Sequence, residues 1–180
     1  FCGVVAVKPT YGVVSRYGVV AFGSSLDQVG PFARSVEDAA LALNAVSGRD
    51  ELDCTSQNVT CDFTANLAEG VRGMRVGVVP AFMEAKGLDA EVRAKVEEAA
   101  AHLRSLGAEV VEVELPHARA AMSAYYVLGP CEAFSNLARF DSVRYGYCDG
   151  DHADLGGQDE ASRAKGFGPE ARRRIMLGSY

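Results

Sequence analysis

The sequence predicts an α/β fold. Short runs rich in β-branched residues occur near the start of the chain and again at 74–80 and 110–115. Two longer segments, 36–46 and 90–106, repeat their apolar residues at spacings of three and four. The first pattern is typical of strands and the second of amphipathic helices. Because the two patterns alternate along one chain, we expect helices packed against a β-sheet in a layered structure.

The first predicted strand is the apolar run at residues 3–7. We expect it to be buried and to stop pairing at Lys8-Pro9, because proline has no backbone N–H to donate. Residues 10–34 carry four glycines with no sustained period, which predicts a long ordered loop that crosses the core. Loops of this length commonly carry function.

The segment 36–46 is predicted to be a helix that Ser35 caps and Gly48 ends. Its first turn contains Glu37 and Asp38, whose charges suit the positive N-terminal end of a helix dipole. Residues 49–70 are polar and rich in turn formers, so we expect them to run over the surface.

A βαβ unit is predicted at 71–116. The strands at 74–80 and 110–115 flank a helix that begins after Asp89 and ends at Gly107. Two strands joined by a helical crossover are expected to lie parallel in one sheet.

The remainder, 117–180, is predicted to be mainly helical. One helix is expected from His117 to about Phe140, broken or kinked at Gly129-Pro130 because proline disrupts helical hydrogen bonding. Residues 149–159 are rich in glycine and acids and predict a loop. A final helix should begin at Pro169, a favourable first helical residue.

Composition narrows the class of protein. With 48% hydrophobic residues, the chain of 180 residues can bury a substantial core. The net charge of -6 and the pI near 5.1 argue against a stand-alone nucleic-acid binder, which needs clustered Lys and Arg. No apolar run approaches the roughly 20 residues of a membrane span. Five irregularly spaced cysteines without a Cys-x-x-Cys pair predict free thiols of a reducing, cytoplasmic compartment rather than a metal site.

Common catalytic signatures are absent from the sequence. It contains no Gly-x-Ser-x-Gly elbow, no Gly-x-Gly-x-x-Gly and no Walker loop. The chain begins within a strand-like run without an initiator methionine and stops within a helical run, and we therefore expect it to be an internal piece of a longer protein. Residue chemistry alone indicates an α/β domain and no specific function.

Longer stretches of the sequence resemble the amidase-signature family. The first part matches the region that follows the nucleophilic serine in those enzymes. The runs that carry this match are Phe1-Cys2-Gly3-Val4-Val5-Ala6-Val7-Lys8-Pro9-Thr10-Tyr11-Gly12, Val14-Ser15-Arg16-Tyr17-Gly18, and Ser24-Ser25-Leu26-Asp27-Gln28-Val29-Gly30-Pro31. This resemblance implies the amidase-signature fold, with a mixed central β-sheet flanked by helices.

Later stretches are similar, within that family, to the glutaminase components of tRNA-dependent amidotransferases. They comprise Tyr125-Tyr126, residues 132–146, residues 166–170 and residues 173–178. The resemblance implies one internal fragment of a single amidase domain over 1–180, with the downstream half of the signature core at 1–50. A surface loop at 51–70, the βαβ unit at 71–116 and a helical glutamine-pocket region at 117–180 follow.

The resemblance also implies a reaction. In the family, a serine nucleophile, a second serine beside a cis peptide and a lysine release ammonia from the side-chain amide of glutamine, through a covalent intermediate. These catalytic groups correspond to no residue of this chain, and we expect the fragment to be inactive alone. What the match places here is glutamine binding: Arg174 corresponds to the arginine that holds the α-carboxylate, and Tyr125 to a tyrosine of the pocket.

Partners follow from the same resemblance. Subunits B and C of the amidotransferase would bind Glu-tRNA(Gln), ATP and Mg²⁺, and no cofactor is implied for this chain. The acidic charge agrees with RNA contact through a partner. Two other functions stay open, a free-standing amidase and a non-catalytic interaction module.

Several residues have a structural alternative to a functional role. Without the family match, residues 172–174 would indicate a solvated cationic helix face, and we keep that interpretation for Arg172. One of Tyr125 and Tyr126 is expected to be a packing residue. Asp27 is expected to hydrogen-bond the backbone of its own loop, with Ser24 and Ser25 also structural. Lys8 is given no catalytic role.

Overall fold

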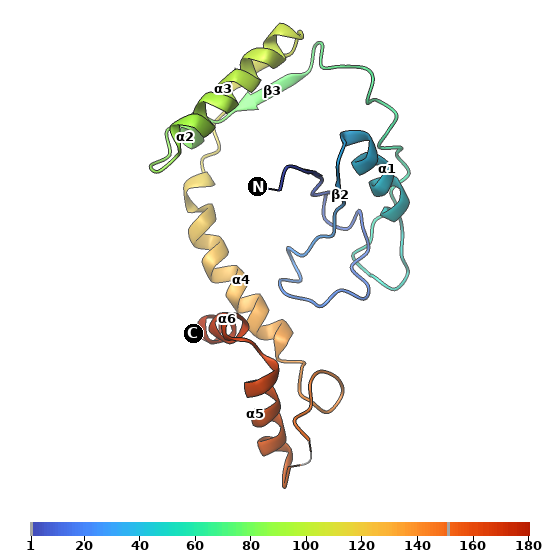
Figure 1. Ribbon diagram of the computed structural model, residues 1–180, viewed down its shortest axis with the longest axis vertical. Coiled ribbons are helices and arrows are strands. Elements are labelled where there is room, and N and C mark those ends of the chain that lie inside the picture. The colour runs from blue at the N-terminus through green and yellow to red at the C-terminus, as the bar shows by residue number, and fades with distance from the viewer. Residues whose placement is uncertain (1, 151) are drawn as a thin grey trace. The chain divides into compact units, whose positions relative to one another are not determined.

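The computed structural model describes residues 2–150 and 152–180. Phe1, the first residue of the family motif, and one position of the predicted loop at 149–159 lie outside this description. The chain divides into two compact units, one formed by 1–61 with 120–180 and the other by 62–119 (Figure 1). The predicted α/β class is confirmed, and the described strands form two separate two-stranded sheets.

The first sheet consists of β1 (Val5–Ala6) and β2 (Phe32–Ala33), which pair antiparallel. The strand predicted at 3–7 is thus present over two residues, and the prediction that it is buried is wrong, because Val5 is half-buried and Ala6 is exposed. The backbone of Val7 extends the pairing by donating to the carbonyl of Pro31 at 3.1 Å. Gly30 allows this approach, since a side chain there would overlap the Val7 carbonyl.

Helix α1 (Val36–Val46) confirms the predicted helix and packs against β1 and β2. The Ser35 side chain caps it by accepting a hydrogen bond from the Asp38 N–H at 3.0 Å. The residues that α1 buries are Ala39, Ala40 and Leu43, with relative exposures of 7% or less. With Val13 and Val14 of the preceding loop they form the core of this part of the unit.

The segment after α1 was expected to run over the surface, and this is wrong for its first part. Residues 50–57 return to the loop at 10–30, and Asp53 and Ser56 are buried. The Gln57 N–H donates to the carbonyl of Gly12 at 2.8 Å. Residues 50–57 therefore pack against the loop at 10–30.

The second unit contains the βαβ arrangement predicted from the sequence. Strands β3 (Arg75–Val78) and β4 (Glu109–Glu112) are parallel, with Arg75 opposite Glu109, and α3 (Ala90–Ser105) connects them. Asp89 caps α3, as predicted, by accepting from the Glu91 N–H. The short helix α2 (Pro80–Met83) was not predicted.

The long helix α4 (Ala121–Leu137) follows a short 3-10 turn, η1 (Ala118–Ala120). Of the predicted break or kink at Gly129-Pro130, the break is wrong, because Pro130 lies inside one continuous helix. Both residues are buried, and α6 (Pro169–Gly178) packs across α4 at this point (Figure 1). The start of α6 at Pro169 confirms the prediction.

The loop predicted at 149–159 is wrong over its second half, where helix α5 (Leu155–Gly166) begins. Asp154 caps this helix by accepting from the Gly157 N–H at 2.8 Å. Arg163 of α5 donates to the carbonyls of Leu137 and Phe140 at 3.1 and 3.0 Å. The helix is therefore tied to the C-terminal end of α4 by contacts that are distant in the sequence.

No helix among the described residues combines the length and the apolar character needed to cross a membrane.

Candidate functional site

Arg174 of α6 and Tyr125 of α4 lie next to each other in the first unit. The guanidinium Nη1 of Arg174 is 3.5 Å from the Tyr125 hydroxyl, at the outer limit of a hydrogen bond. The two residues are 49 positions apart in sequence. They meet because α6 crosses α4 where Gly178 and Pro130 allow the two backbones to approach closely. The structure thus brings together both residues that the family resemblance placed in the glutamine pocket.

Glu170 fixes the guanidinium of Arg174 from the opposite side. It lies one helical turn earlier on α6, and its Oε1 accepts from the Nε of Arg174 at 2.8 Å. Arg173 donates to both oxygens of the same carboxylate, at 2.9 and 2.7 Å. Hydrogen bonds from Arg173 and then Arg174 lower the pKa of Glu170 to about 2. The carboxylate is therefore ionised at neutral pH and orients Arg174 through its Nε.

Phe22 completes the surroundings of the guanidinium. Its ring centroid is 5.3 Å from the Cζ of Arg174, a distance at which a cation interacts favourably with the face of an aromatic ring. Glu170 accepts a hydrogen bond from the Nε of Arg174, and Tyr125 lies beside its Nη1. The Phe22 ring covers one face of the guanidinium. The remaining guanidinium N–H groups are the ones that could bind an anion, and the planar fork of arginine suits a carboxylate.

The loop that carries Phe22 is held by Asp27 as predicted. The carboxylate of Asp27 accepts from the backbone N–H groups of Phe22 and Gly23 at 2.9 and 3.0 Å. This confirms its structural role. Ser24 and Ser25 are structural as well: Ser24 Oγ donates to Asn136 Oδ1 at 2.9 Å, and the Ser25 N–H donates to Glu132 at 3.0 Å.

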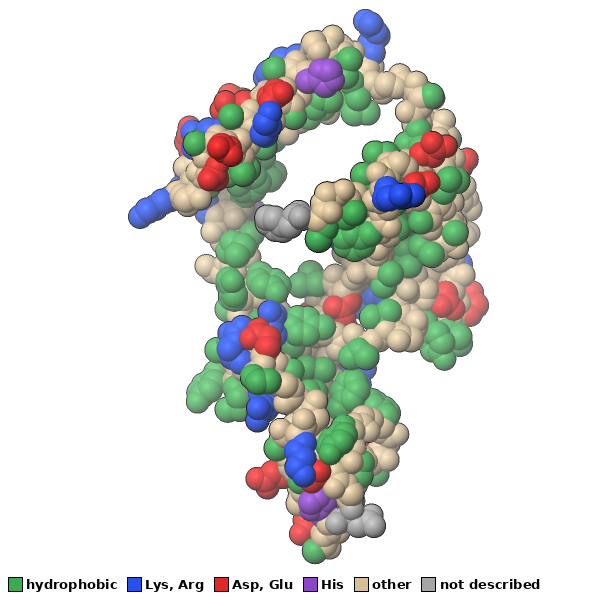
Figure 2. Space-filling model, in the orientation of Figure 1, with side chains coloured by type: hydrophobic (Ala, Val, Ile, Leu, Met, Phe, Trp, Pro, Cys, Tyr) green, Lys and Arg blue, Asp and Glu red, His purple; other side chains and the backbone are tan. Residues whose placement is uncertain are grey.

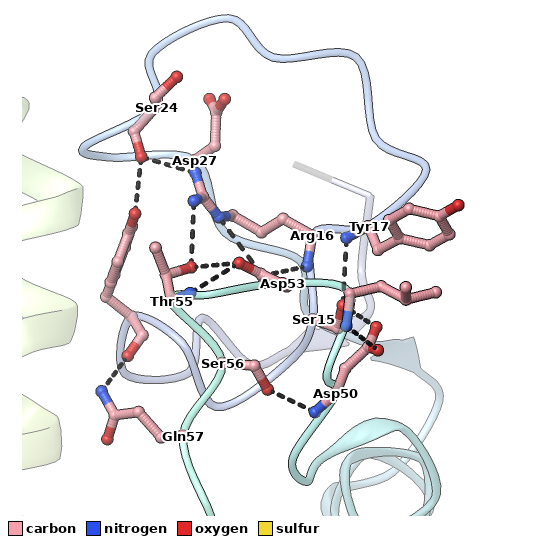
Figure 3. Close-up of polar contacts among 12 residues, drawn as sticks. Ser15, Arg16, Tyr17, Ser24, Asp27, Asp50, Asp53, Thr55, Ser56 and Gln57 are labelled. Atoms are coloured by element: carbon pink, nitrogen blue, oxygen red, sulfur yellow. Dashed lines mark hydrogen bonds and ion pairs between the residues drawn. The ribbon is translucent and has the colours of Figure 1, made fainter.

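A second polar cluster fixes the other end of this loop (Figure 3). Arg16 donates to the carbonyl of Ser24 at 2.6 Å and to the hydroxyl of Thr55 at 3.1 Å. Asp53 accepts from the Arg16 N–H at 2.9 Å and from the hydroxyl of Thr55 at 2.7 Å. The backbone N–H of Arg16 and then the hydroxyl of Thr55 lower the pKa of Asp53 to about 2. The residues labelled in Figure 3 thereby connect the loop at 10–30 to residues 50–57.

Exposure separates the two neighbouring tyrosines. Tyr125 is 41% exposed and Tyr126 is 64% exposed, and their rings meet edge to face at 5.4 Å. Both side chains are exposed, so the expectation that one of them is a core or half-buried packing residue is wrong. In the space-filling view hydrophobic side chains gather along α4 (Figure 2).

Arg174 is half-buried, whereas Arg172 is exposed, as its interpretation as a solvated residue requires.

Sequence reasoning missed most of the residues that support Arg174. Glu132 lies seven residues after Tyr125, and Asn136 lies four residues after Glu132, so all three are on one face of α4. That spacing is visible in the sequence, but the loop that these side chains contact is more than 100 residues away. Phe22 and Asp53 gave no local signal, and Arg16 lies in a run that carries the family resemblance but was assigned no role. Lys8, which was assigned no catalytic role from the sequence, donates to the Oε1 of Gln28 at 2.8 Å.

Comparison with known proteins bears on the family to which the chain belongs. The family model described as Amidase matches residues 1–180. The chain is 52% identical to the A subunit of the glutamyl-tRNA(Gln) amidotransferase of Synechococcus sp. (strain CC9902) and 53% identical to that of Halorhodospira halophila. These matches cover 100% and 99% of the chain and 37% of each relative. The chain thus spans a little over a third of the length of these relatives.

Solved structures give the same result. The crystal structure of the A subunit of the glutamyl-tRNA(Gln) amidotransferase from Thermotoga maritima superposes with a TM-score of 0.72 at 41% identity, covering 99% of this chain and 34% of that one. The native peptide amidase of Stenotrophomonas maltophilia superposes with a TM-score of 0.70 at 32% identity, covering 98% and 37%. Because the family model extends over the whole chain and enzymes of this fold superpose on it, the chain belongs to the amidase-signature family.

Proposed function

We propose that this chain forms part of the glutaminase subunit of a glutamyl-tRNA(Gln) amidotransferase, and that it supplies the site for the α-carboxylate of glutamine. The observation that carries the proposal is the contact between Arg174 and Tyr125, with Glu170 and Phe22 bracing the same guanidinium. The names of the relatives support the choice of this component. The full protein would release ammonia from glutamine for the conversion of Glu-tRNA(Gln) to Gln-tRNA(Gln).

In this proposal Arg174 binds and orients the substrate. Two guanidinium N–H groups would donate in parallel to the two carboxylate oxygens. This sets the orientation of the substrate and also recognises its negative charge. Tyr125 would donate its hydroxyl hydrogen to the same carboxylate or line the pocket beside it. Holding the α-carboxylate limits the region that the side-chain amide can reach, which favours attack by a nucleophile placed there.

We assign none of the family's catalytic serines or its lysine to these 180 residues. The chemical step would therefore need groups that this chain does not contribute, and the chain alone is expected to release no ammonia from glutamine. Addition of glutamine to the isolated chain, followed by ammonia detection, tests this directly. Release above the buffer rate would overturn that part of the proposal.

Partners of the full protein belong to the proposal too. Subunits B and C would assemble with it in the cytoplasm, and Glu-tRNA(Gln), ATP and Mg²⁺ would bind mainly to those partners. The net charge of -6 favours tRNA binding by a partner rather than by this chain.

The likeness to a peptide amidase supports a second candidate, a free-standing amidase that acts on other amides. Substitution of Arg174 separates the two, because a neutral amide offers no carboxylate for a guanidinium. In the full-length protein, Arg174→Lys should raise the KM for glutamine about 10- to 100-fold, since lysine cannot donate two parallel bonds. Arg172→Lys on the exposed face of the same helix is the matched control. An unchanged KM for glutamine in Arg174→Lys would sink the carboxylate assignment.

A further inference from the structure

One face of α4 contacts both Arg174 and the loop that carries Phe22. Tyr125, Glu132 and Asn136 lie at spacings of seven and four, so they project from the same side of the helix. Gly129 occupies the intervening turn, and a side chain there would meet the Tyr125 ring. Tyr125 touches Arg174 at one end of this face, while Glu132 and Asn136 hold residues 22–25 at the other.

Asn136 has a buried side chain whose amide is bonded at both ends. It is 6% exposed. Its Nδ2 donates to the carbonyl of Phe22 at 3.0 Å, and its Oδ1 accepts from Ser24 Oγ at 2.9 Å and from Arg139 at 2.7 Å. Because a buried amide that loses a partner keeps the cost of its desolvation, these bonds hold the side chain in one orientation.

The backbone of Phe22 is consequently fixed on both sides. Asp27 accepts from its N–H at 2.9 Å, and Asn136 donates to its carbonyl at 3.0 Å. Only the two side-chain torsions of Phe22 are then left to place the ring against the guanidinium of Arg174. Glu132 adds a third attachment by accepting from the hydroxyl and from the N–H of Ser25, and these bonds, the hydroxyl first, lower the pKa of the Glu132 carboxyl group.

We propose that Asn136 is a positioning residue for substrate recognition: by holding the backbone of Phe22 it keeps the aromatic ring against Arg174 and so aims the guanidinium at the substrate carboxylate. Glu132 assists through Ser25. This inference rests on the proposed role of Arg174 in binding glutamine. It assigns specificity to residues that touch neither the substrate nor the reacting atoms.

Steady-state kinetics of the full-length protein with glutamine test the inference at two steps. Phe22→Leu removes the ring and keeps an apolar side chain of similar size. Asn136→Asp replaces the donor at the Phe22 carbonyl with an acceptor. Each should raise the KM for glutamine about three- to tenfold and leave kcat within about twofold, because binding is weakened and the chemistry is not. Tyr17→Leu in the same loop and Asn58→Asp, both at exposed residues, are the matched controls.

A double-mutant cycle with Arg174→Lys identifies the route of the effect. If Phe22 and Asn136 act through Arg174, their effect on KM should largely disappear in the Arg174→Lys background, whereas a general structural defect would multiply with it. An unchanged KM in both Phe22→Leu and Asn136→Asp, or full multiplication in the cycle, overturns the inference while the role of Arg174 stands. If Arg174→Lys itself has no effect on KM, the proposed function fails instead. Phe22→Leu keeps the test decisive if Asn136→Asp does not fold.

Discussion

Gly178 of α6 lies directly against the carbonyl oxygen of Pro130 in α4, so closely that a side chain at position 178 would overlap it. Pro130 has no N–H and cannot complete the usual helical bond to the carbonyl of residue 126. The proline and the glycine together make the place where the two helices cross. This crossing brings Arg174, one turn before Gly178, to Tyr125.

Replacing Gly178 by alanine should therefore separate the helices. The new methyl group would meet backbone atoms, which cannot move aside as a flexible side chain can. We expect Gly178→Ala to lower the free energy of unfolding by about 2–3 kcal/mol, measured by chemical denaturation of the full-length protein. Gly168→Ala, at the N-cap of α6 with no atom within 4 Å of the new methyl, is the control and should cost less than about 1 kcal/mol, the loss expected for alanine at an N-cap. Equal stability of both variants would contradict the close crossing.

The hydroxyl of Tyr125 should matter for glutamine, and that of Tyr126 should not. Tyr125→Phe removes the group that contacts Arg174 and keeps the ring. Because the contact is long, we expect a KM for glutamine that rises only about two- to fivefold. Tyr126→Phe is the matched control on the adjacent, more exposed ring. Similar KM values for the two variants would remove Tyr125 from the site.

Asp53 should make the anchored loop sensitive to acid. Its pKa lies at about 2, below the ordinary value of 3.8, because the N–H of Arg16 and the hydroxyl of Thr55 stabilise the charged form. A lowered pKa stabilises the folded state above the unfolded value, and this stabilisation is lost as the pH falls from about 4 toward 2. The difference in unfolding free energy between the unaltered protein and Asp53→Asn should therefore shrink from pH 5 to pH 3. A difference that stays constant over this range would show that Asp53 gains nothing from these contacts.

Elements with strong local signals were predicted well from the sequence. Helices α1 and α3 have capping side chains at Ser35 and Asp89 and a regular apolar spacing, and both formed where expected. Their boundaries depend on neighbouring residues, which a sequence pattern can show. The parallel pairing of β3 and β4 followed from the helix between them.

Elements that depend on distant contacts were missed or misjudged. Helix α5 has Gly156 and Gly157 in its first turn, which disfavours a helix locally, yet Arg163 ties it to the carbonyls that end α4. Strand β2 is only two residues long and exists through its pairing with β1. Helix α4 continues through Pro130 at the place where Gly178 of α6 packs against it, a contact that no local pattern shows.

The residues of the candidate site, too, were predictable from the sequence only in part. Arg174 and Tyr125 could be named from the family resemblance, and the structure places them in contact. The residues that hold the loop beside them could not be named, because Asn136 and Phe22 are 114 positions apart. Asn136 lies in the stretch 132–146 that carries the family resemblance, but the resemblance assigned it no role.

A crystal structure of the full-length protein with glutamine bound, its nucleophile replaced to prevent turnover, tests the central claim most directly. The claim predicts that both α-carboxylate oxygens lie about 2.7–3.2 Å from guanidinium nitrogens of Arg174, with Phe22 still against the guanidinium and Glu170 still on its Nε. A carboxylate held by a different cation, with Arg174 contacting only Glu170 and solvent, would contradict it.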